Sequence, residues 1–160
     1  MTNRRHFTLG SVCLAALGLG MRSASAQQTA SFEVRRSDAE WRRLLTPEQF
    51  GVLRQSKTER AGSSPLDRER RAGIFHCAGC DLPLFSSAAK YDSGTGWPSF
   101  WQPLDNAIGT KQETGFLFVT QTEVHCRRCG GHLGHVFDDG PPPTGKRYCM
   151  NGVAMNFIPA

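Results

Sequence analysis

The chain has 160 residues, six cysteines and a net charge of +5, and 39% of its residues are hydrophobic. This length corresponds to about one domain, which argues against a multidomain enzyme. No uncharged apolar run reaches the roughly 18 residues that a membrane-spanning helix needs. A positive net charge is typical of proteins that bind nucleic acid. The positions of the basic residues decide whether it indicates nucleic-acid binding here.

The first 26 residues have the pattern of an export signal. A basic start, Arg4-Arg5-His6-Phe7, is followed by the uncharged apolar run 9–19 and by Ala24-Ser25-Ala26, a typical signal-peptidase site. The paired arginines favour the twin-arginine pathway. We predict cleavage after Ala26, a periplasmic location and no stable membrane anchor. An ordinary secretory signal and an uncleaved anchor are the alternatives.

Cleavage of this segment changes the meaning of the charge. It removes three basic residues, Arg4, Arg5 and Arg22, and no acidic one, which lowers the net charge from +5 to +2. The remaining lysines and arginines alternate with aspartates and glutamates. The charge therefore gives little support for a nucleic-acid partner.

The mature chain is expected to begin with a flexible polar segment at 27–36, followed by one domain at 37–160. Ser37 with Glu40 forms a capping box, and Thr46 followed by Pro47 forms a second helix start, so two short helices should open the domain. Residues 60–71 predict a loop. Short β-forming runs separated by Gly, Pro and Asp then predict a mainly antiparallel β domain. These runs are 73–76, 115–120, 123–125, 135–137, 147–150 and 154–158.

Four of the six cysteines form two Cys-x-x-Cys pairs. Each pair presents two thiolates on one tight turn, and two facing turns complete a tetrahedron of ligands around zinc. Gly79 and the Gly130-Gly131 dipeptide suit turns at which the backbone approaches a metal. We predict one structural zinc ion in a closed site formed by Cys77, Cys80, Cys126 and Cys129.

Two disulfides are the alternative for these cysteines, because an exported protein meets oxidising conditions. Neighbouring cysteines in a Cys-x-x-Cys pair make strained disulfides, which argues against this pairing. The twin-arginine pathway also exports proteins that are already folded, so a metal can bind before transport.

Cys149 is the single free thiol left in the mature chain, since Cys13 lies in the export signal. A lone cysteine in a strand is most often a buried apolar residue. This one follows Lys146-Arg147, whose charge favours the thiolate, and the chain also offers His132 and His135 as acid–base groups. Cys149 is therefore a candidate nucleophile.

The chain contains three further motifs, interleaved with the cysteine pairs. They are Ser93-Gly94-Thr95-Gly96-Trp97-Pro98-Ser99-Phe100, Gly131-His132-Leu133-Gly134-His135-Val136-Phe137-Asp138-Asp139-Gly140-Pro141 and Arg147-Tyr148-Cys149-Met150-Asn151. In sequence and in order they resemble the signature motifs of the B-type methionine sulfoxide reductases, over about residues 41–158. The resemblance implies reduction of the R epimer of methionine sulfoxide, mainly in proteins. It also implies two antiparallel sheets packed into a β-tent or barrel-like body with a structural zinc.

The resemblance implies roles that agree with the chemistry of the substrate. Methionine sulfoxide has an electrophilic sulfur and a basic oxygen, so its reduction needs an attacking thiolate and an acid that protonates the oxygen. Cys149 is expected to attack and to become a sulfenic acid. His135 is expected to donate the proton, with His132 as an orienting or secondary acid. Considered alone, each histidine is as often structural as catalytic.

Four other residues are assigned around Cys149. Asn151 and Arg147 each lie two residues from it on the same face of the predicted strand, where Asn151 can hydrogen-bond at the site and Arg147 can stabilise the thiolate. Trp97, with Phe137 as a weaker candidate, is expected to form an apolar wall for the methyl group of the substrate. The alternative is that both are simply core aromatic residues.

The chain departs from the family pattern at Thr95, where many members carry a second, resolving cysteine. A sulfenic acid on Cys149 then has no partner in the mature chain unless the metal site gives up a thiol. We therefore expect recycling by an external reductant, either a thioredoxin-like or glutaredoxin-like protein or a small thiol. Gly152 and Asn156 also differ from the usual Ser and Arg, which affects expected substrate contacts.

Two other function classes fit parts of the pattern. A zinc-ribbon module that binds protein or nucleic acid explains the cysteine pairs, but it leaves Cys149, both histidines and the export signal unexplained. A Cys-His hydrolase would use Cys149, His135 and an Asp. We expect instead a monomeric reductase that acts on oxidised proteins or methionine sulfoxide and binds no nucleic acid.

Overall fold

The computed structural model describes residues 32–114 and 120–160. The predicted export signal, residues 27–31 of the segment predicted to be flexible and all but the last residue of the predicted strand at 115–120 lie outside these residues. No helix in the described part of the chain has the length and apolar character that crossing a membrane requires.

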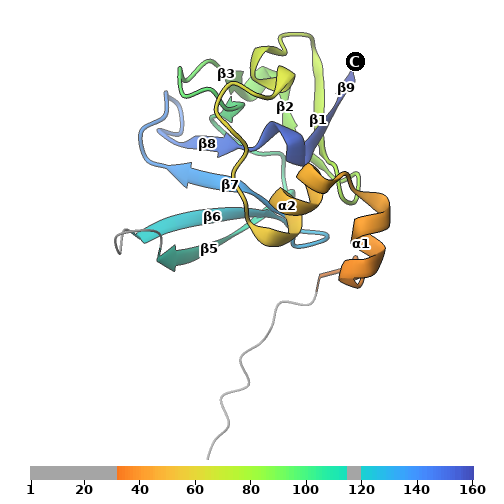
Figure 1. Cartoon of the computed structure of the whole chain (residues 1–160). Helices are drawn as coiled ribbons and strands as arrows, with labels where there is room; N and C mark the ends of the chain where they lie inside the picture. The colour runs from red at the N-terminus through yellow and green to blue at the C-terminus, as the bar shows by residue number, and fades with distance from the viewer. Residues whose placement is uncertain (1–31, 115–119) are drawn as a thin grey trace, which may run out of the picture. The chain divides into compact units, whose positions relative to one another are not determined.

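Two helices open the domain, as the capping residues predict. α1 spans Asp38–Leu44 and α2 spans Pro47–Gln55. The Ser37 hydroxyl accepts the Glu40 N–H at 3.3 Å, and the Glu40 carboxylate accepts the Ser37 N–H at 2.8 Å, which completes the predicted capping box. Thr46 caps α2 in the same way. α2 lies against β7 (Figure 1).

The strands form two antiparallel sheets, which confirms the predicted mainly β fold (Figure 1). The small sheet has the order β2-β1-β9, and the large sheet has the order β3-β4-β8-β7-β6-β5. The strands are β1 Gly73–Cys77, β2 Pro83–Ser86, β3 Lys90–Tyr91, β4 Ser99–Phe100, β5 Ile108–Thr114, β6 Thr120–Cys126, β7 His132–Phe137, β8 Arg147–Met150 and β9 Met155–Pro159.

The predicted β runs at 73–76, 123–125, 135–137 and 147–150 lie within β1, β6, β7 and β8. The run at 154–158 corresponds to β9, but Ala154 belongs to the preceding 3-10 turn η4, Gly152–Ala154. The predicted loop at 60–71 contains a second 3-10 turn, η1, Pro65–Arg68. β2 to β5 are not among the predicted runs.

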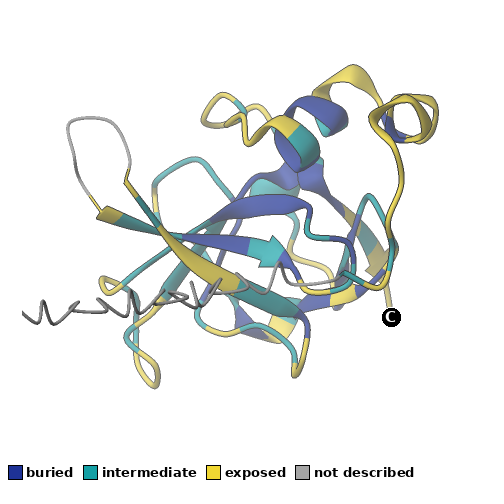
Figure 2. Ribbon diagram, turned by 90° about the horizontal axis from the view of Figure 1, so that it is seen from below, coloured by how far each residue is buried: buried dark blue, intermediate teal, exposed yellow. Residues whose placement is uncertain are grey.

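Aromatic side chains from both sheets fill the core. Phe85 of the small sheet stacks on Phe100 of the large sheet, with ring centroids 4.4 Å apart, and Phe75 meets Phe100 edge-on at 5.0 Å. All three are fully buried. Figure 2 shows that burial is concentrated in the middle of the sheets, whereas the outer β5 edge is exposed. Burial of these rings fixes the two sheets against each other.

The order of the large sheet places β8 between β4 and β7. Cys149 on β8 therefore has a neighbour on each side, Ser99 on β4 and His135 on β7. The chain then leaves the large sheet after Met150 and passes through η4 into β9 of the small sheet. The strand register thus brings the candidate nucleophile and the candidate acid together.

Candidate functional site

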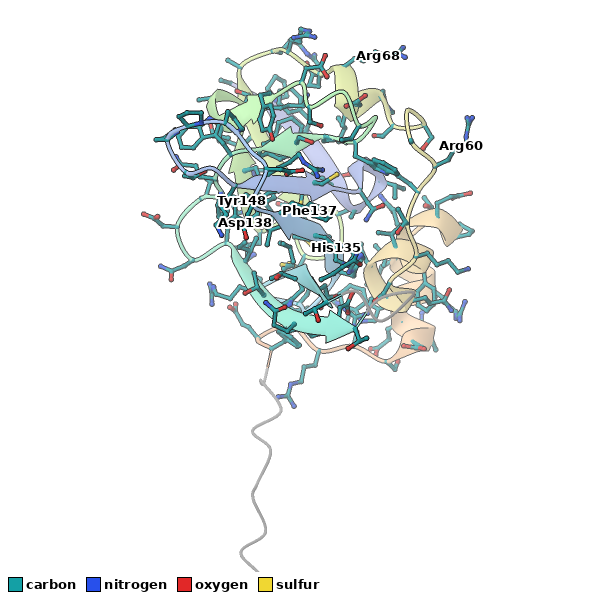
Figure 3. All side chains as sticks on the ribbon, turned by 90° about the vertical axis from the view of Figure 1, so that its left-hand side faces the viewer. Arg60, Arg68, His135, Phe137, Asp138 and Tyr148 are labelled. Atoms are coloured by element: carbon teal, nitrogen blue, oxygen red, sulfur yellow. The ribbon has the colours of Figure 1, made fainter. Side chains whose placement is uncertain are left out.

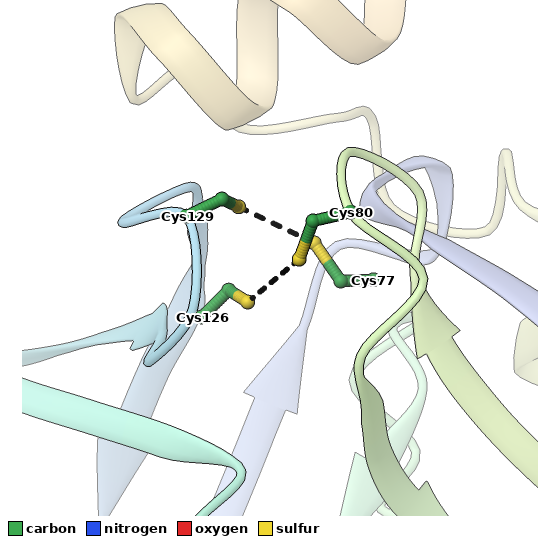
Figure 4. Close-up of side chains that lie close together, drawn as sticks. All are labelled: Cys77, Cys80, Cys126 and Cys129. Atoms are coloured by element: carbon green, nitrogen blue, oxygen red, sulfur yellow. Dashed lines mark hydrogen bonds between the residues drawn. The ribbon is translucent and has the colours of Figure 1, made fainter. Parts of the chain in front are cut away.

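The two Cys-x-x-Cys pairs meet at one point (Figure 4). The four sulfur atoms all lie within 4.8 Å of one another, with 3.7 Å between Cys77 Sγ and Cys129 Sγ and 3.4 Å between Cys80 Sγ and Cys126 Sγ. In a tetrahedral site with metal–sulfur bonds of about 2.3 Å, the sulfurs are about 3.8 Å apart. A disulfide brings them to about 2 Å. The arrangement therefore fits four ligands of one metal ion and does not fit two disulfides.

The two turns have the same backbone geometry. Cys77 ends β1 and its carbonyl accepts the Asp81 N–H at 2.8 Å, while Cys126 ends β6 and its carbonyl accepts the Gly130 N–H at 2.8 Å. Asp81 and Gly130 both have left-handed backbone, with φ of 60° and 68°. One pair therefore comes from each sheet. A bound metal would connect the small sheet to the large one.

Cys149 lies in a separate small pocket. The pocket holds about 140 Å³ and brings together five of the predicted site residues. Cys149 is half-buried, and the residue paired with it on the neighbouring strand β7 is His135. Figure 3 shows His135 and Phe137 on β7 beside Tyr148 of β8. The lining residues are Thr58, Trp97, Gly134, His135, Phe137, Cys149 and Asn151.

His135 has a carboxylate partner that the sequence does not reveal. Its Nε2 lies 2.9 Å from Oε1 of Glu113 on β5, and the His135 side chain is 22% exposed. A carboxylate that hydrogen-bonds one ring nitrogen of an imidazole fixes the orientation of the ring. His135 is thus placed to give up a proton inside the pocket.

His132 lies behind His135 and is not part of the pocket lining. Its ring meets that of His135 edge-on, with centroids 5.4 Å apart, and its Nδ1 lies 2.8 Å from Oε1 of Glu123. Burial lowers the pKa of His132, which keeps the ring neutral at pH 7. Its Nε2 is buried and has no hydrogen-bond partner within 32–114 and 120–160. This position suits the predicted orienting role better than direct contact with a substrate.

Lys111 connects the two carboxylates. Its Nζ lies 3.1 Å from Oε2 of Glu123 and 3.8 Å from Oε2 of Glu113. Burial favours the neutral acid at Glu123, but the hydrogen bonds from His132 and Lys111 outweigh it and lower the Glu123 pKa. The pocket is therefore backed by two histidine–carboxylate pairs that share one lysine.

Arg147 makes its direct contacts away from the pocket, and the prediction that it stabilises the Cys149 thiolate stays a prediction. Its guanidinium forms a two-pronged pair with the Asp139 carboxylate, at 2.9 and 2.8 Å, and lies 4.3 Å from the centre of the Phe137 ring. The hydrogen bond to Asp139 raises the Arg147 pKa. Arg147 is absent from the pocket lining. Its direct contacts are with Phe137 and Asp139, and its charge acts on Cys149 through space.

The acidic residues after Phe137 also pair away from the histidines. Asp138 bonds to Lys146, and Asp139 bonds to Arg147. The carboxylates that contact His132 and His135 are glutamates from β6 and β5. The geometry therefore does not provide the Cys-His-Asp arrangement of the hydrolase alternative.

Asn151 and Trp97 are both held by one loop residue, Glu59. The Asn151 side chain is buried, donates to the Leu133 carbonyl at 3.0 Å and accepts the Glu59 N–H at 2.9 Å. The Trp97 indole donates to the Glu59 carbonyl at 3.2 Å. Asn151 keeps one amide hydrogen that can point into the pocket.

The Glu59 side chain anchors the same loop to the chain beyond Cys149. Its two carboxylate oxygens accept the backbone N–H groups of Gly152 and Val153 at 2.6 and 2.9 Å. These are the first residues of η4, directly after Asn151. Glu59 therefore positions two sides of the pocket at once. No local sequence pattern indicates this role, because its partners lie 38 to 94 residues away.

Thr95 contacts the reactive sulfur. Its Oγ1 lies 3.8 Å from Cys149 Sγ and 2.8 Å from the Ser93 hydroxyl, which in turn lies 2.7 Å from the Ser99 hydroxyl. A chain of hydroxyl groups thus ends at the sulfur. The departure from the family pattern is therefore located in contact with Cys149.

The described residues thus combine a mainly β domain, a four-cysteine cluster and a separate pocket in which a free cysteine faces a histidine, an arrangement that fits an enzyme with a thiol active site. A model of the SelR domain matches residues 45–159. The chain is 50% identical over 119 residues to the chloroplastic peptide methionine sulfoxide reductase B1 of Arabidopsis thaliana, an alignment that covers 74% of this chain and 59% of that longer protein.

Two bacterial relatives match over nearly their whole length. Identity to the peptide methionine sulfoxide reductase MsrB of Agrobacterium fabrum is 49%, covering 79% of this chain and 94% of the relative. Identity to the MsrB of Pseudomonas entomophila is 51%, covering 75% and 92%. The chain belongs to the SelR family, the B-type methionine sulfoxide reductases.

Proposed function

We propose that this protein reduces the R epimer of methionine sulfoxide in oxidised proteins, with Cys149 as the nucleophile. The observation that carries the proposal is the placement of Cys149 opposite His135 in one pocket, in a chain of this family. Trp97 and Phe137 line the same pocket and suit the methyl group of the substrate. The zinc-ribbon alternative accounts for none of these placements.

The reaction is a transfer of oxygen from sulfur to sulfur. The Cys149 thiolate reacts with the sulfoxide, His135 donates a proton to the substrate oxygen, and that oxygen ends on Cys149 as a sulfenic acid while methionine leaves. The cysteine sulfur loses two electrons and the methionine sulfur gains them. Glu113 holds His135, and the second amide hydrogen of Asn151 is available to the oxygen.

Recycling then requires a thiol from outside the chain. A first thiol attacks the sulfenic acid, which forms a mixed disulfide with Cys149 and releases water, and a second thiol frees Cys149. Thr95 occupies the contact position on the sulfur, and a threonine cannot form a disulfide. The thiol donor is a thioredoxin-like or glutaredoxin-like protein or a small thiol.

The metal in this proposal is one zinc ion on the four clustered cysteines. Four protein ligands leave no open position, so the ion has a structural function and takes no part in the reaction. The predicted export signal supports a periplasmic site of action, where methionine residues are exposed to oxidants.

The activity is tested by incubating the protein with separate R and S epimers of N-acetylmethionine sulfoxide and a thiol donor. Methionine should form from the R epimer alone, and Cys149→Ser should lower the rate by at least about 10³-fold. The metal content of the variant should stay that of the wild type. Unchanged reduction by Cys149→Ser, or release of acid from esters, would end the reductase assignment.

The recycling route is tested by mass spectrometry after one turnover without reductant. The wild type should carry one added oxygen on Cys149. Thr95→Cys is the matched control, because it places a second sulfur at the contact position and should instead show an intramolecular disulfide. A disulfide to Cys149 in the wild type would overturn recycling by an external thiol.

A further inference from the structure

A second and much larger hollow adjoins the active-site pocket. It holds about 900 Å³ between α2, the 57–66 loop and the segment from η4 into β9. We call it the 57–66 groove. Its apolar lining includes Val52, Leu66, Val153, Met155 and Phe157. The reaction described above uses none of these side chains.

The 57–66 groove is continuous with the pocket that contains Cys149. Thr58 lines both of them. Glu59, the next residue, lines the groove and holds Asn151 and Trp97 of the pocket through its backbone. Gly152, directly after Asn151, lines the groove as well. The groove therefore begins where the pocket ends.

The size of the pocket limits what it can hold. Pockets that enclose a whole drug-sized ligand hold about 300–1,000 Å³. The Cys149 pocket, at about 140 Å³, has room for a single side chain. When the methionine sulfoxide belongs to a polypeptide, the residues next to it must lie outside the pocket. The 57–66 groove is the adjoining hollow large enough for them.

The charged residues around the groove include both signs, so they do not favour a substrate of one charge. Lys57, Arg60 and Glu48 all line it, and none of the three forms an ion pair within the described ranges 32–114 and 120–160. Arg60 extends into solvent (Figure 3). Apolar contact with side chains such as Leu66 is therefore the basis for selection.

We propose that the 57–66 groove binds the residue next to methionine sulfoxide in a polypeptide substrate, and that it favours an apolar side chain there. This proposal rests on the proposed reductase activity, and it names a feature of the substrate that the chemistry at Cys149 does not require. Burial of part of a leucine side chain in the groove should raise kcat/KM by about fivefold.

Kinetics on matched substrates test the groove. The substrates are N-acetylmethionine R-sulfoxide, a capped tripeptide with alanine on both sides of the sulfoxide, and the two tripeptides with leucine on one side. The wild type should prefer one leucine peptide by about fivefold. Leu66→Ser should remove this preference and keep the rate on the single amino acid. Leu44→Ser is the control, because Leu44 is 58% exposed on α1, outside the groove lining.

If Leu66→Ser does not fold, crosslinking provides an independent test of the groove. An oxidised peptide with a benzoylphenylalanine next to the sulfoxide is bound to Cys149→Ser, irradiated and mapped by mass spectrometry. Attachment to the groove residues Leu66, Val153 or Phe157 is expected. Attachment only on the β7 side would overturn the proposal. So would equal rates on the alanine and leucine peptides.

Sulfoxide reduction and leucine preference are separate properties of the protein, and the kinetics measure each one. If the wild type reduces no sulfoxide at all, the proposed function fails, and the crosslinking pattern still reports which residues line the peptide path. If it reduces the single amino acid but shows no leucine preference, the function holds and the groove proposal is wrong.

Discussion

The clustered cysteines and Cys149 place the same side chain in opposite surroundings. Cys77, Cys126 and Cys129 are buried, and each sulfur in the cluster has another sulfur within 4.8 Å. Cys149 is half-buried and faces a histidine, an aromatic wall and a hydroxyl group. A thiolate surrounded by other thiolates is suited to binding a metal ion, and a single thiolate beside a proton donor is suited to nucleophilic attack. The neighbouring residues therefore determine which of the two functions a cysteine can have.

The largest expected effect comes from breaking the cluster. Cys126→Ser removes one of four metal ligands, and the binding free energy of structural zinc, about 10 kcal/mol or more, is comparable to the whole stability of a domain. We expect loss of bound metal and unfolding, measured by metal analysis and by circular dichroism.

Cys149→Ser is the control for that experiment, since it exchanges the same atoms outside the cluster. It should keep both the metal and the melting temperature. A Cys126→Ser variant that remains folded without metal would show that packing of the two sheets alone holds the domain.

The next largest effect is expected from removing His135, the candidate proton donor beside Cys149. His135→Gln keeps a hydrogen-bonding side chain of similar size but cannot donate a proton at neutral pH, so kcat should fall by about 10² to 10³-fold. Single-turnover kinetics with the R sulfoxide measure the loss.

His132→Gln is the matched control, because His132 lies behind His135 and outside the pocket lining. A smaller loss is expected there. If His132→Gln were the more damaging change, the two histidines would have to exchange their assigned roles.

A smaller effect is expected from Glu59, whose carboxylate holds the backbone next to the pocket at Gly152 and Val153. In Glu59→Gln, the amide oxygen can still accept one of the N–H groups of Gly152 and Val153, but as a neutral acceptor, and the amide nitrogen cannot accept the other. We expect kcat/KM to fall by about tenfold while the metal content is unchanged. Steady-state kinetics and metal analysis measure the two quantities.

Glu48→Gln makes the same exchange at a groove residue that has no ion pair in the described chain, and it should behave as the wild type. Equal kinetics for the two variants would show that Glu59 has no positioning function.

The smallest effect is a dependence of stability on pH. Burial lowers the pKa of His132, so the unfolded chain binds a proton there more readily than the folded one. This contribution to stability is complete above the ordinary histidine pKa of about 6.5 and is lost as the pH falls below it. Urea unfolding between about pH 7.5 and about pH 5.5 measures the slope.

The slope should become shallower in His132→Gln. Burial lowers the pKa of His125 as well, and His125 is present in both proteins, so the difference between them isolates His132. An identical slope in the two proteins would show that His132 is not the titrating group.

Features with a local cause could be predicted from the sequence. The capping boxes of α1 and α2 join residues three apart, and each Cys-x-x-Cys turn is a short segment that closes on itself. To predict the four-cysteine cluster, it was enough to assume in addition that the two turns face each other. The order of the motifs identified the family.

Features set by strand pairing could not be predicted. Glu113 reaches His135 because β5, β6 and β7 are neighbours, and no pattern within the polar strand β5 indicates that order. Strand alternation predicts that Arg147 shares a face with Cys149, but it does not indicate that Asp139, just after β7, pairs with the guanidinium. Alternation gives the face of a strand, whereas the turns decide which partner a long side chain finds.

The position of Cys149 in the middle of the large sheet limits how substrate and reductant can reach its sulfur. β8 is hydrogen-bonded to β4 on one side and to β7 on the other, so the backbone that carries the sulfur has no hinge. In the reaction proposed above, the sulfur would therefore stay in place between the two half-reactions, and a thiol donor would have to enter the pocket that methionine leaves. Oxidised substrate and reductant would then compete for one opening, and an excess of either one would slow the half-reaction of the other.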